Sequence, residues 1–224
     1  MCGRFSLSSS PQRLRDRFAL AAAPDEVVAH YNIAPSQDVL VIPNRHQRLL
    51  RPARWGLVPW FAKDPSIGHR MINARAESLV QRPAFRELLE RQRCVVPADG
   101  FFEWQRIDRK TRQPFHIRAR DGEPLALAGL WDLWRTPDGD KLASCTIITV
   151  PANGVVSPIH DRMPAVLSPE GVDVWLDPAP APAGELAPLL APAPDDSLVA
   201  LPVSSRVNKP DHDDPECVQP VSTS

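Results

Sequence analysis

Ser144-Cys145-Thr146-Ile147-Ile148-Thr149-Val150 is the run that sets the fold class of this 224-residue chain. Its β-branched residues suit a pleated, half-buried surface, so the run predicts a strand. Other short runs of alternating or apolar residues, bounded by turn residues, predict further strands. They lie at residues 4–8, 38–42, 48–55, 94–96, 101–106, 114–118, 125–134 and 198–203.

Capping signals predict short helices between these strands. Ser10 precedes Pro11 and Ser168 precedes Pro169, the usual order of an N-cap residue and a first-turn proline. Another helix is predicted over residues 83–90. The helix after Ser168 is expected to bury a short apolar run, Val174, Trp175 and Leu176.

Many strands with few helices predict an α+β fold. We expect a single compact domain over residues 1–224, with a mainly antiparallel, barrel-like β core flanked by short helices. Residues 177–197 are rich in proline and alanine and predict a covering arm with at most one short helix, near 185–190. Residues 31–35 are expected to form an ordered loop, and residues 211–224 a loose tail.

The composition excludes several classes of protein. The formal net charge is -1, so the whole chain lacks the basic signature of a nucleic-acid binder, although arginines concentrate in residues 1–135. We find no apolar run of spanning length and no signal peptide, which predicts a cytosolic or nucleoid-associated protein away from membranes. We also expect a monomer. No Cys-x-x-Cys pair occurs among Cys2, Cys94, Cys145 and Cys217, so we expect no metal site, and we expect no cofactor.

The start of the chain, Met1-Cys2-Gly3-Arg4, carries a distinctive chemical possibility. Removal of Met1 would leave Cys2 with a free α-amine beside its thiol. An aldehyde condenses with such an amine to an imine, and the thiol then closes a five-membered thiazolidine. The amine has a reference pKa of about 8 and the thiol of about 8.5, so both are usable near neutral pH. On position alone, the favoured interpretation is that Cys2 is incidental, and the rest of the chain changes this.

Three segments share one spacing, in which an arginine follows a polar or reactive residue by two positions. The pairs are Cys2 with Arg4, Asn73 with Arg75, and His160 with Arg162. On extended backbone, such residues face the same side, roughly 6.5–7 Å apart. An arginine placed there can bind a phosphate through two parallel hydrogen bonds. Taken singly, each pair is also explained by a surface arginine beside a structural residue.

Glu103 lies in Asp99-Gly100-Phe101-Phe102-Glu103-Trp104, among three aromatic residues. In an apolar cleft the pKa of its carboxyl would rise, which favours proton donation near pH 7. On the solvent face of a strand it would have no such role. Trp60-Phe61 follows Trp55-Gly56-Leu57-Val58-Pro59, and two adjacent large rings in a loop suggest a stacking platform for unpaired bases.

Together, these residues resemble the SRAP family, the SOS-response-associated peptidase domain that shields abasic sites in DNA. The matching segments occur in the family's order over nearly the whole chain, which makes the set specific. They are residues 1–5, 31–35, 55–59, 72–77, 99–104, 159–164 and 203–204.

The resemblance implies a catalytic set of four residues. Cys2, freed of Met1, would crosslink to the sugar aldehyde of an abasic site, with Asn73 positioning the adduct. Glu103 would act as general acid and base, and His160 would protonate the sugar oxygen during ring opening. Single-stranded DNA would be bound by a wider set, Arg4, Asn32, Pro35, Trp60, Phe61, Arg75, Trp104, Thr149 and Arg162.

Other activities are compatible with the same residues. Cys2 could be the nucleophile of a cysteine peptidase that removes its own leader. The protein could bind single strands noncovalently, or an imine at Cys2 could start a lyase reaction. The sequence also departs from the family, which usually has an aromatic residue followed by tryptophan after Val58-Pro59, whereas here the order is Trp60-Phe61.

Overall fold

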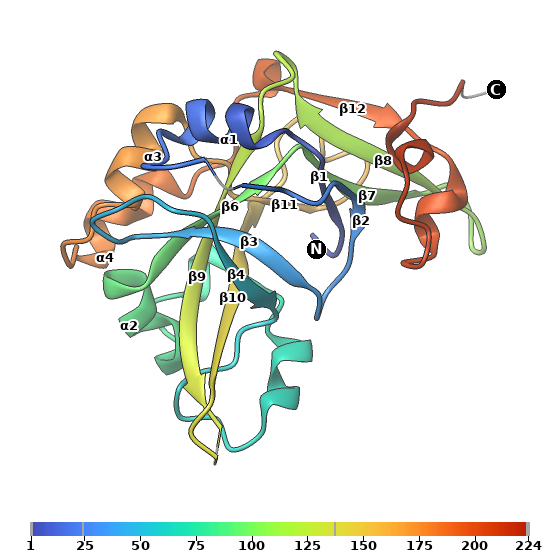
Figure 1. Cartoon of the computed structure of the whole chain (residues 1–224). Helices are drawn as coiled ribbons and strands as arrows, with labels where there is room; N and C mark the ends of the chain where they lie inside the picture. Colours follow the sequence, from blue (N-terminus) through green and yellow to red (C-terminus); the bar gives the residue numbers. More distant parts are fainter. Residues whose placement is uncertain (1, 24, 137, 223–224) are drawn as a thin grey trace.

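Five strands close into a barrel at the centre of the protein (Figure 1). We describe a computed structural model over residues 2–23, 25–136 and 138–222, so Met1 and the last two residues lie outside the described chain. In ring order the strands are β10 (Lys141–Pro151), β4 (Arg51–Trp55), β3 (Asp38–Pro43), β6 (Arg93–Ala98) and β9 (Leu125–Arg135), and β9 pairs back onto β10. Each pairing is antiparallel except that of β4 with β10, so the barrel is mixed.

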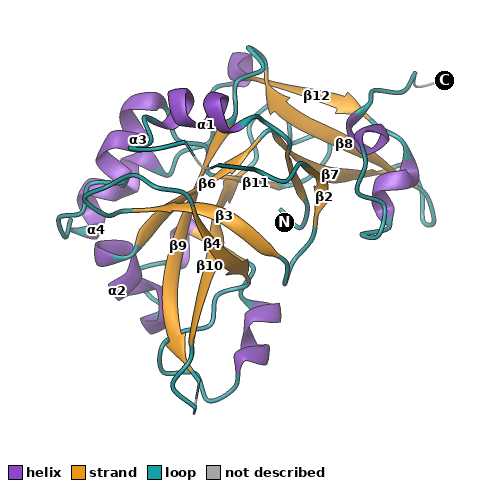
Figure 2. Ribbon diagram, in the orientation of Figure 1, coloured by secondary structure: helices purple, strands orange, loops and turns teal. Residues whose placement is uncertain are grey.

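A second, antiparallel sheet lies beside the barrel (Figure 2). Its order is β12 (Leu198–Pro202), β8 (Arg112–Ala119), β7 (Gly100–Arg106), β1 (Phe5–Leu7) and β2 (His30–Ile33). The chain passes from β6 in the barrel to β7 in this sheet at Asp99-Gly100. A Cβ atom on Gly100 would lie 2.3 Å from His116 Nε2 of β8, so only glycine allows this close passage.

Two three-residue strands extend β10 beyond the barrel. β5 (Asn73–Arg75) pairs with it in parallel, with Ile147 opposite Asn73 and Thr149 opposite Arg75. β11 (Arg162–Pro164) pairs with it antiparallel, with Pro151 opposite Arg162. The second half of β10, from Ile147 to Pro151, is called its far half. It brings together two of the three segments in which an arginine follows a polar or reactive residue.

Short helices cover the outside of the barrel, as predicted. They are α1 (Pro11–Phe18), α2 (Pro83–Arg91), α3 (Pro169–Trp175) and α4 (Ala183–Leu186). The Ser10 hydroxyl accepts a hydrogen bond from Arg13 N, and the Ser168 hydroxyl accepts one from Gly171 N, which confirms both N-caps. Short 3₁₀ helices also occur in the described residues. They lie at Pro65–Arg70, Ala76–Ser78, Ala187–Leu189, Asp195–Ser197, Ser205–Asn208 and Pro215–Val218.

Three local predictions are corrected by the structure. Residues 30–33 form strand β2, because they pair with β1, so only the end of the expected loop at 31–35 is irregular. Val174 is 50% exposed, because it lies on the outer face of α3 while Trp175 is buried. The segment from Asp211 to Val218 is ordered, because Cys217 is buried and Asp213 and Asp214 both form hydrogen bonds; residues 223–224 lie outside the described residues.

Arg93 ties the arm at 177–197 and two helices to the barrel. Its side chain is fully buried, and its five N–H groups match five backbone carbonyl groups. The acceptors are Leu89 O and Glu90 O at the end of α2, Trp175 O at the end of α3, and Asp177 O and Ala179 O in the arm, at 2.6–3.1 Å. The cation also lies at the negative ends of both helix dipoles, which favours its charge there.

We expect Arg93→Met to lower the free energy of unfolding by at least about 3 kcal/mol, because several carbonyl groups would lose their partners inside the protein. Urea unfolding monitored by tryptophan fluorescence measures this change. Arg91→Met, two residues earlier and exposed, is the matched control and should change stability by less than about 0.5 kcal/mol. Equal midpoints for the two variants would contradict the role assigned to Arg93.

Candidate active site

Four segments converge where the second sheet meets the far half of β10. Phe5 pairs with Phe101, and Phe102 N donates to Arg4 O at 2.9 Å, so pairing of the N-terminal segment with β7 carries Cys2 alongside Glu103. From β5, Asn73 Nδ2 donates to Cys2 O at 2.8 Å. The Cys2 side chain is fully buried.

Glu103 projects from β7 into this buried region and is only 3% exposed. Burial raises the pKa of its carboxyl above the ordinary value, and the charge of nearby His160 acts in the opposite direction. The pKa of the Cys2 thiol is raised as well, mainly by burial and then by the Glu103 carboxylate. The electrostatic effects of Glu103 on Cys2 and of His160 on Glu103 show that these three side chains lie near one another.

His160 has geometry for both of its protonation states. Its Nδ1 lies 3.0 Å from Arg162 N and 2.9 Å from a carboxylate oxygen of Asp161. One ring nitrogen cannot accept from an N–H group and donate to a carboxylate at once. Without a proton, Nδ1 can accept from Arg162 N; with a proton, Nδ1 can donate to Asp161.

The three arginines occupy different environments. Arg4 Nη1 donates to Asn32 Oδ1 at 2.7 Å and to Val207 O at 3.0 Å, and the guanidinium lies 5.9 Å from the centre of the Trp104 ring. Arg162 forms two hydrogen bonds with the Glu77 carboxylate and one with Thr149 O at 2.6 Å. Its side chain is only 12% exposed, so in this structure Arg162 joins β11, β10 and the turn after β5.

Arg75 differs from both because it is exposed on β5. Among the described residues, its guanidinium takes part in no hydrogen bond or ion pair. Arg75 is therefore the arginine of the three with the most surface available for a phosphate. Thr149, opposite Arg75 on β10, is buried, and its hydroxyl faces Ala74 O. Thr149 therefore packs beneath β5 and is not on the surface beside Arg75.

Asn32 is buried and holds the C-terminal segment to β2. The two N–H groups of its side chain are shared among three carbonyl oxygens of that segment, Val207 O, Lys209 O and His212 O, at 2.6–3.2 Å from the nitrogen. Its side-chain oxygen accepts from Arg4. Asn32 therefore positions Arg4 between the sheet and the last part of the chain.

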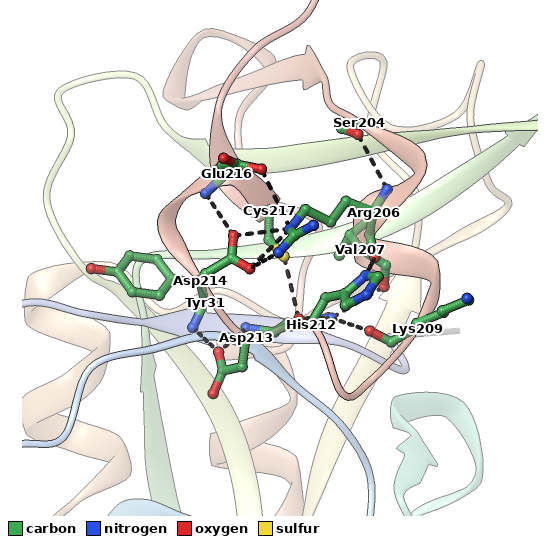
Figure 3. A network of polar contacts seen from close by, with 11 residues as sticks. Tyr31, Ser204, Arg206, Val207, Lys209, His212, Asp213, Asp214, Glu216 and Cys217 are labelled. Atoms are coloured by element: carbon green, nitrogen blue, oxygen red, sulfur yellow. Dashed lines mark hydrogen bonds and ion pairs between the residues drawn. The ribbon is translucent and has the colours of Figure 1, made fainter.

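Residues 203–218, the C-terminal latch, contribute a polar network that sequence reasoning missed (Figure 3). Asp213 accepts from Tyr31 N at 2.5 Å and from Asn32 N at 2.9 Å, and its carboxylate lies 2.6 Å from His30 Nδ1. Asp214 pairs with Arg206, and this ion pair folds the latch on itself. The only signal in the sequence was the acidic run at 211–214 after Arg206, which is equally typical of a solvated tail.

The predicted aromatic residues lie in two places. Trp60 and Phe61 are 64% and 52% exposed and contact each other edge to face, and Trp60 N is held by Asp132 of β9. Trp104 is half-buried next to Glu103, and its Nε1 donates to Asn208 Oδ1 at 2.7 Å. Pro35 is half-buried after β2. The structure therefore places Trp104 beside Arg4 and the C-terminal segment and leaves Trp60 and Phe61 on a separate loop.

The described residues include neither a metal-type cluster nor a membrane-spanning helix. No cluster of three or more histidine, cysteine, aspartate or glutamate side chains there could hold a metal ion. None of the helices in this part of the chain has the length and apolar character needed to cross a membrane.

Comparison with known families decides the relationship of this chain. A family profile described as SOS response associated peptidase (SRAP) matches residues 1–210. The chain belongs to the SRAP family. Among relatives of this SRAP protein, the abasic site processing protein YoqW of Bacillus subtilis is 43% identical over 98% of this chain and 99% of its own. The abasic site processing protein HMCES of Gallus gallus is 34% identical over 99% of this chain and 78% of its own.

Solved structures agree on the fold of the SRAP protein. A crystal structure of a protein from Bacteroides thetaiotaomicron superimposes with a TM-score of 0.88 at 26% sequence identity, covering 99% of this chain and 100% of that one. A protein from Bordetella bronchiseptica gives a TM-score of 0.79 at 28% identity. The barrel and the sheet beside it are thus shared with experimentally determined structures.

The raised pKa of Glu103 predicts a pH-dependent stability. Because the folded pKa exceeds the unfolded one, the folded state binds more protons between the two values, and the unfolding free energy falls as pH rises. Relative to Glu103→Gln, the wild type should be most stable below about pH 4 and lose at most about 1.4 kcal/mol per pH unit above it. Urea unfolding of both proteins from pH 4 to 8 measures this. A difference that does not vary with pH would contradict the assigned shift.

Proposed function

We propose that this SRAP protein processes abasic sites in single-stranded DNA by covalent attachment through Cys2, after Met1 has been removed. The observation that carries the proposal is the convergence of Cys2, Asn73, Glu103 and His160 from four separate segments. The relatives' name, abasic site processing protein, supports the choice of an abasic site as substrate.

The chemistry begins at the sugar of the abasic site, which must open to an aldehyde. His160 with a proton on Nε2 can protonate the ring oxygen as the C1 hydroxyl loses its proton. The Cys2 amine then adds to the aldehyde carbon and gives a carbinolamine. Loss of water from the carbinolamine leaves an imine, and this step requires a proton donor for the departing hydroxyl.

Glu103 is suited to supply that proton. A carboxyl with an ordinary pKa of about 4.3 is almost fully ionised at pH 7, and burial counteracts this by raising the pKa. The Cys2 thiol then adds to the imine carbon, and its proton passes to the nitrogen. The overall reaction joins one aldehyde and one aminothiol into a thiazolidine and releases one water molecule.

Asn73 contributes by orientation. Its hydrogen bond to Cys2 O fixes the carbonyl group of Cys2 relative to β5. The amine and the thiol of the same residue are thereby held in place. Holding both groups in place replaces an unfavourable bimolecular encounter with a local one. Arg75 is exposed two residues after Asn73 on β5, where it is placed to hold a phosphate of the bound DNA strand.

The first test is denaturing electrophoresis of the mature protein mixed with single-stranded DNA containing one abasic site. Wild type should give a stable adduct, whereas protein with a chemically blocked α-amine should give none, because neither imine nor ring can form. Cys2→Ser and Cys2→Ala should give only an imine, trapped by borohydride and lost without it. A stable adduct at normal yield from protein that retains Met1 by mass spectrometry would rule out this mechanism.

A second test addresses the proton donor. Glu103→Gln keeps the size and hydrogen bonding of the side chain but cannot transfer a proton, so adduct formation should slow by about 10²-fold with little change in DNA affinity. Single-turnover crosslinking of both proteins from pH 5 to 9 measures the rates. Superimposable pH–rate profiles would mean that Glu103 has only a structural role. Cleavage of peptides by the wild type, without any DNA adduct, would favour a peptidase instead.

A further inference from the structure

The hairpin that joins β7 to β8 concentrates positive charge. Within residues 106–112 there are four basic residues and one acidic residue, Arg106, Asp108, Arg109, Lys110 and Arg112, although the whole chain has a net charge of -1. Arg106 and Arg112 lie directly opposite each other in the ladder. Like charges in such a position destabilise a sheet, so an anion bound there would reduce the repulsion between Arg106 and Arg112.

The acidic residue does not neutralise this charge. Asp108 accepts from Lys110 N at 2.6 Å and from Thr111 N at 2.7 Å, which closes the turn. Arg106 Nε donates to the backbone oxygen of Asp108, not to its carboxylate. Across residues 2–23, 25–136 and 138–222, none of the hairpin's four cations forms an ion pair. A purely solvated surface would explain the charge, but it would not explain the hollow beside it.

That hollow has a volume of about 340 Å³ and is lined by Trp104, Lys110, Arg112 and Asn208. Trp104 Nε1 is already bonded to Asn208, so the indole offers this space its ring and not its N–H group. Two cations and an aromatic ring around one hollow form a binding surface for a phosphate joined to a planar base.

The position of the hollow relates it to the candidate active site. Trp104 follows Glu103 on β7 but projects from the opposite face, where its ring centre lies 5.9 Å from the guanidinium of Arg4, two residues from Cys2. A strand of nucleic acid attached at Cys2 and passing over Arg4 would therefore reach the hollow within its next few phosphates. In Figure 1 this hairpin lies at the right, far from the tip of β9 and β10 at the bottom.

We propose that Lys110 and Arg112 bind the backbone phosphate of a nucleotide that flanks the abasic site on one side, with Trp104 against its base. This subsite rests on the proposed function, because it assumes that a single strand is held at Cys2. It extends the binding surface to a hairpin outside the segments that carry the family resemblance. The hairpin lies at one end of β7, so the subsite would contact DNA on only one side of the abasic site, either 5′ or 3′.

The test measures binding of single strands that carry a tetrahydrofuran analogue of the abasic sugar, which has no aldehyde and cannot crosslink. Lys110→Gln/Arg112→Gln should weaken binding to a strand with an internal analogue roughly tenfold and lower the log–log salt slope by about 0.7 per lost phosphate contact. Arg135→Gln/Lys141→Gln is the matched control. It removes an equally exposed cationic cross-strand pair, at the tip of β9 and β10, and should leave binding within about twofold.

Strands with the analogue at the 5′ end or the 3′ end test the polarity. The loss in the hairpin variant should persist with one of these two strands and disappear with the other. No loss, equal losses in both double variants, or equal losses with both terminal strands would overturn the proposal. Because the analogue cannot crosslink, failure here is separate from failure of the Cys2 chemistry, which is read from adduct formation with the natural abasic site. Equal urea midpoints for all proteins establish that the variants are folded.

Discussion

Strand β10 has to satisfy its backbone hydrogen bonds with four other strands, β9, β4, β5 and β11, and this requirement organises the molecule. Pairing with β9 closes the barrel at Gly129, which faces both Cys94 and Ile147. A Cβ atom there would lie 2.9 Å from Thr146 O, so the closure depends on glycine. Beyond the barrel, the same strand carries β5 and β11 and so sets the positions of Asn73 and Arg162.

Burial gives this arrangement its chemical character. A carboxyl, a thiol and an imidazole lie within one region, and withdrawal from water raises the pKa of Glu103 and of the Cys2 thiol. The guanidinium of Arg162 is held by Glu77 and Thr149, while that of Arg75 remains at the surface. The carboxyl of Glu103 and the thiol of Cys2 are therefore inside the protein, whereas the guanidinium of Arg75 is at its surface.

The sequence was sufficient for the fold class, because strand composition and capping residues act locally. The catalytic set was implied by the resemblance to the SRAP family and not by local spacing; the structure brings Cys2, Asn73, Glu103 and His160 close together, and their catalytic roles stay predictions. The direction of the Glu103 pKa shift could not be predicted, because it depends on how burial balances neighbouring cations. The latch was mistaken for a loose tail, since Asn32 and Asp213 are 181 residues apart and no local pattern reports their contact.

The latch also has a consequence for folding of the chain during its synthesis. Arg4 obtains its contact with Val207 O only after a residue 203 positions later in the chain has been synthesised. While a ribosome is still translating the C-terminal region, the nascent chain can expose Cys2 but cannot complete the surroundings of Arg4. Interrupted translation would therefore release fragments in which Arg4 lacks its contact with the C-terminal segment.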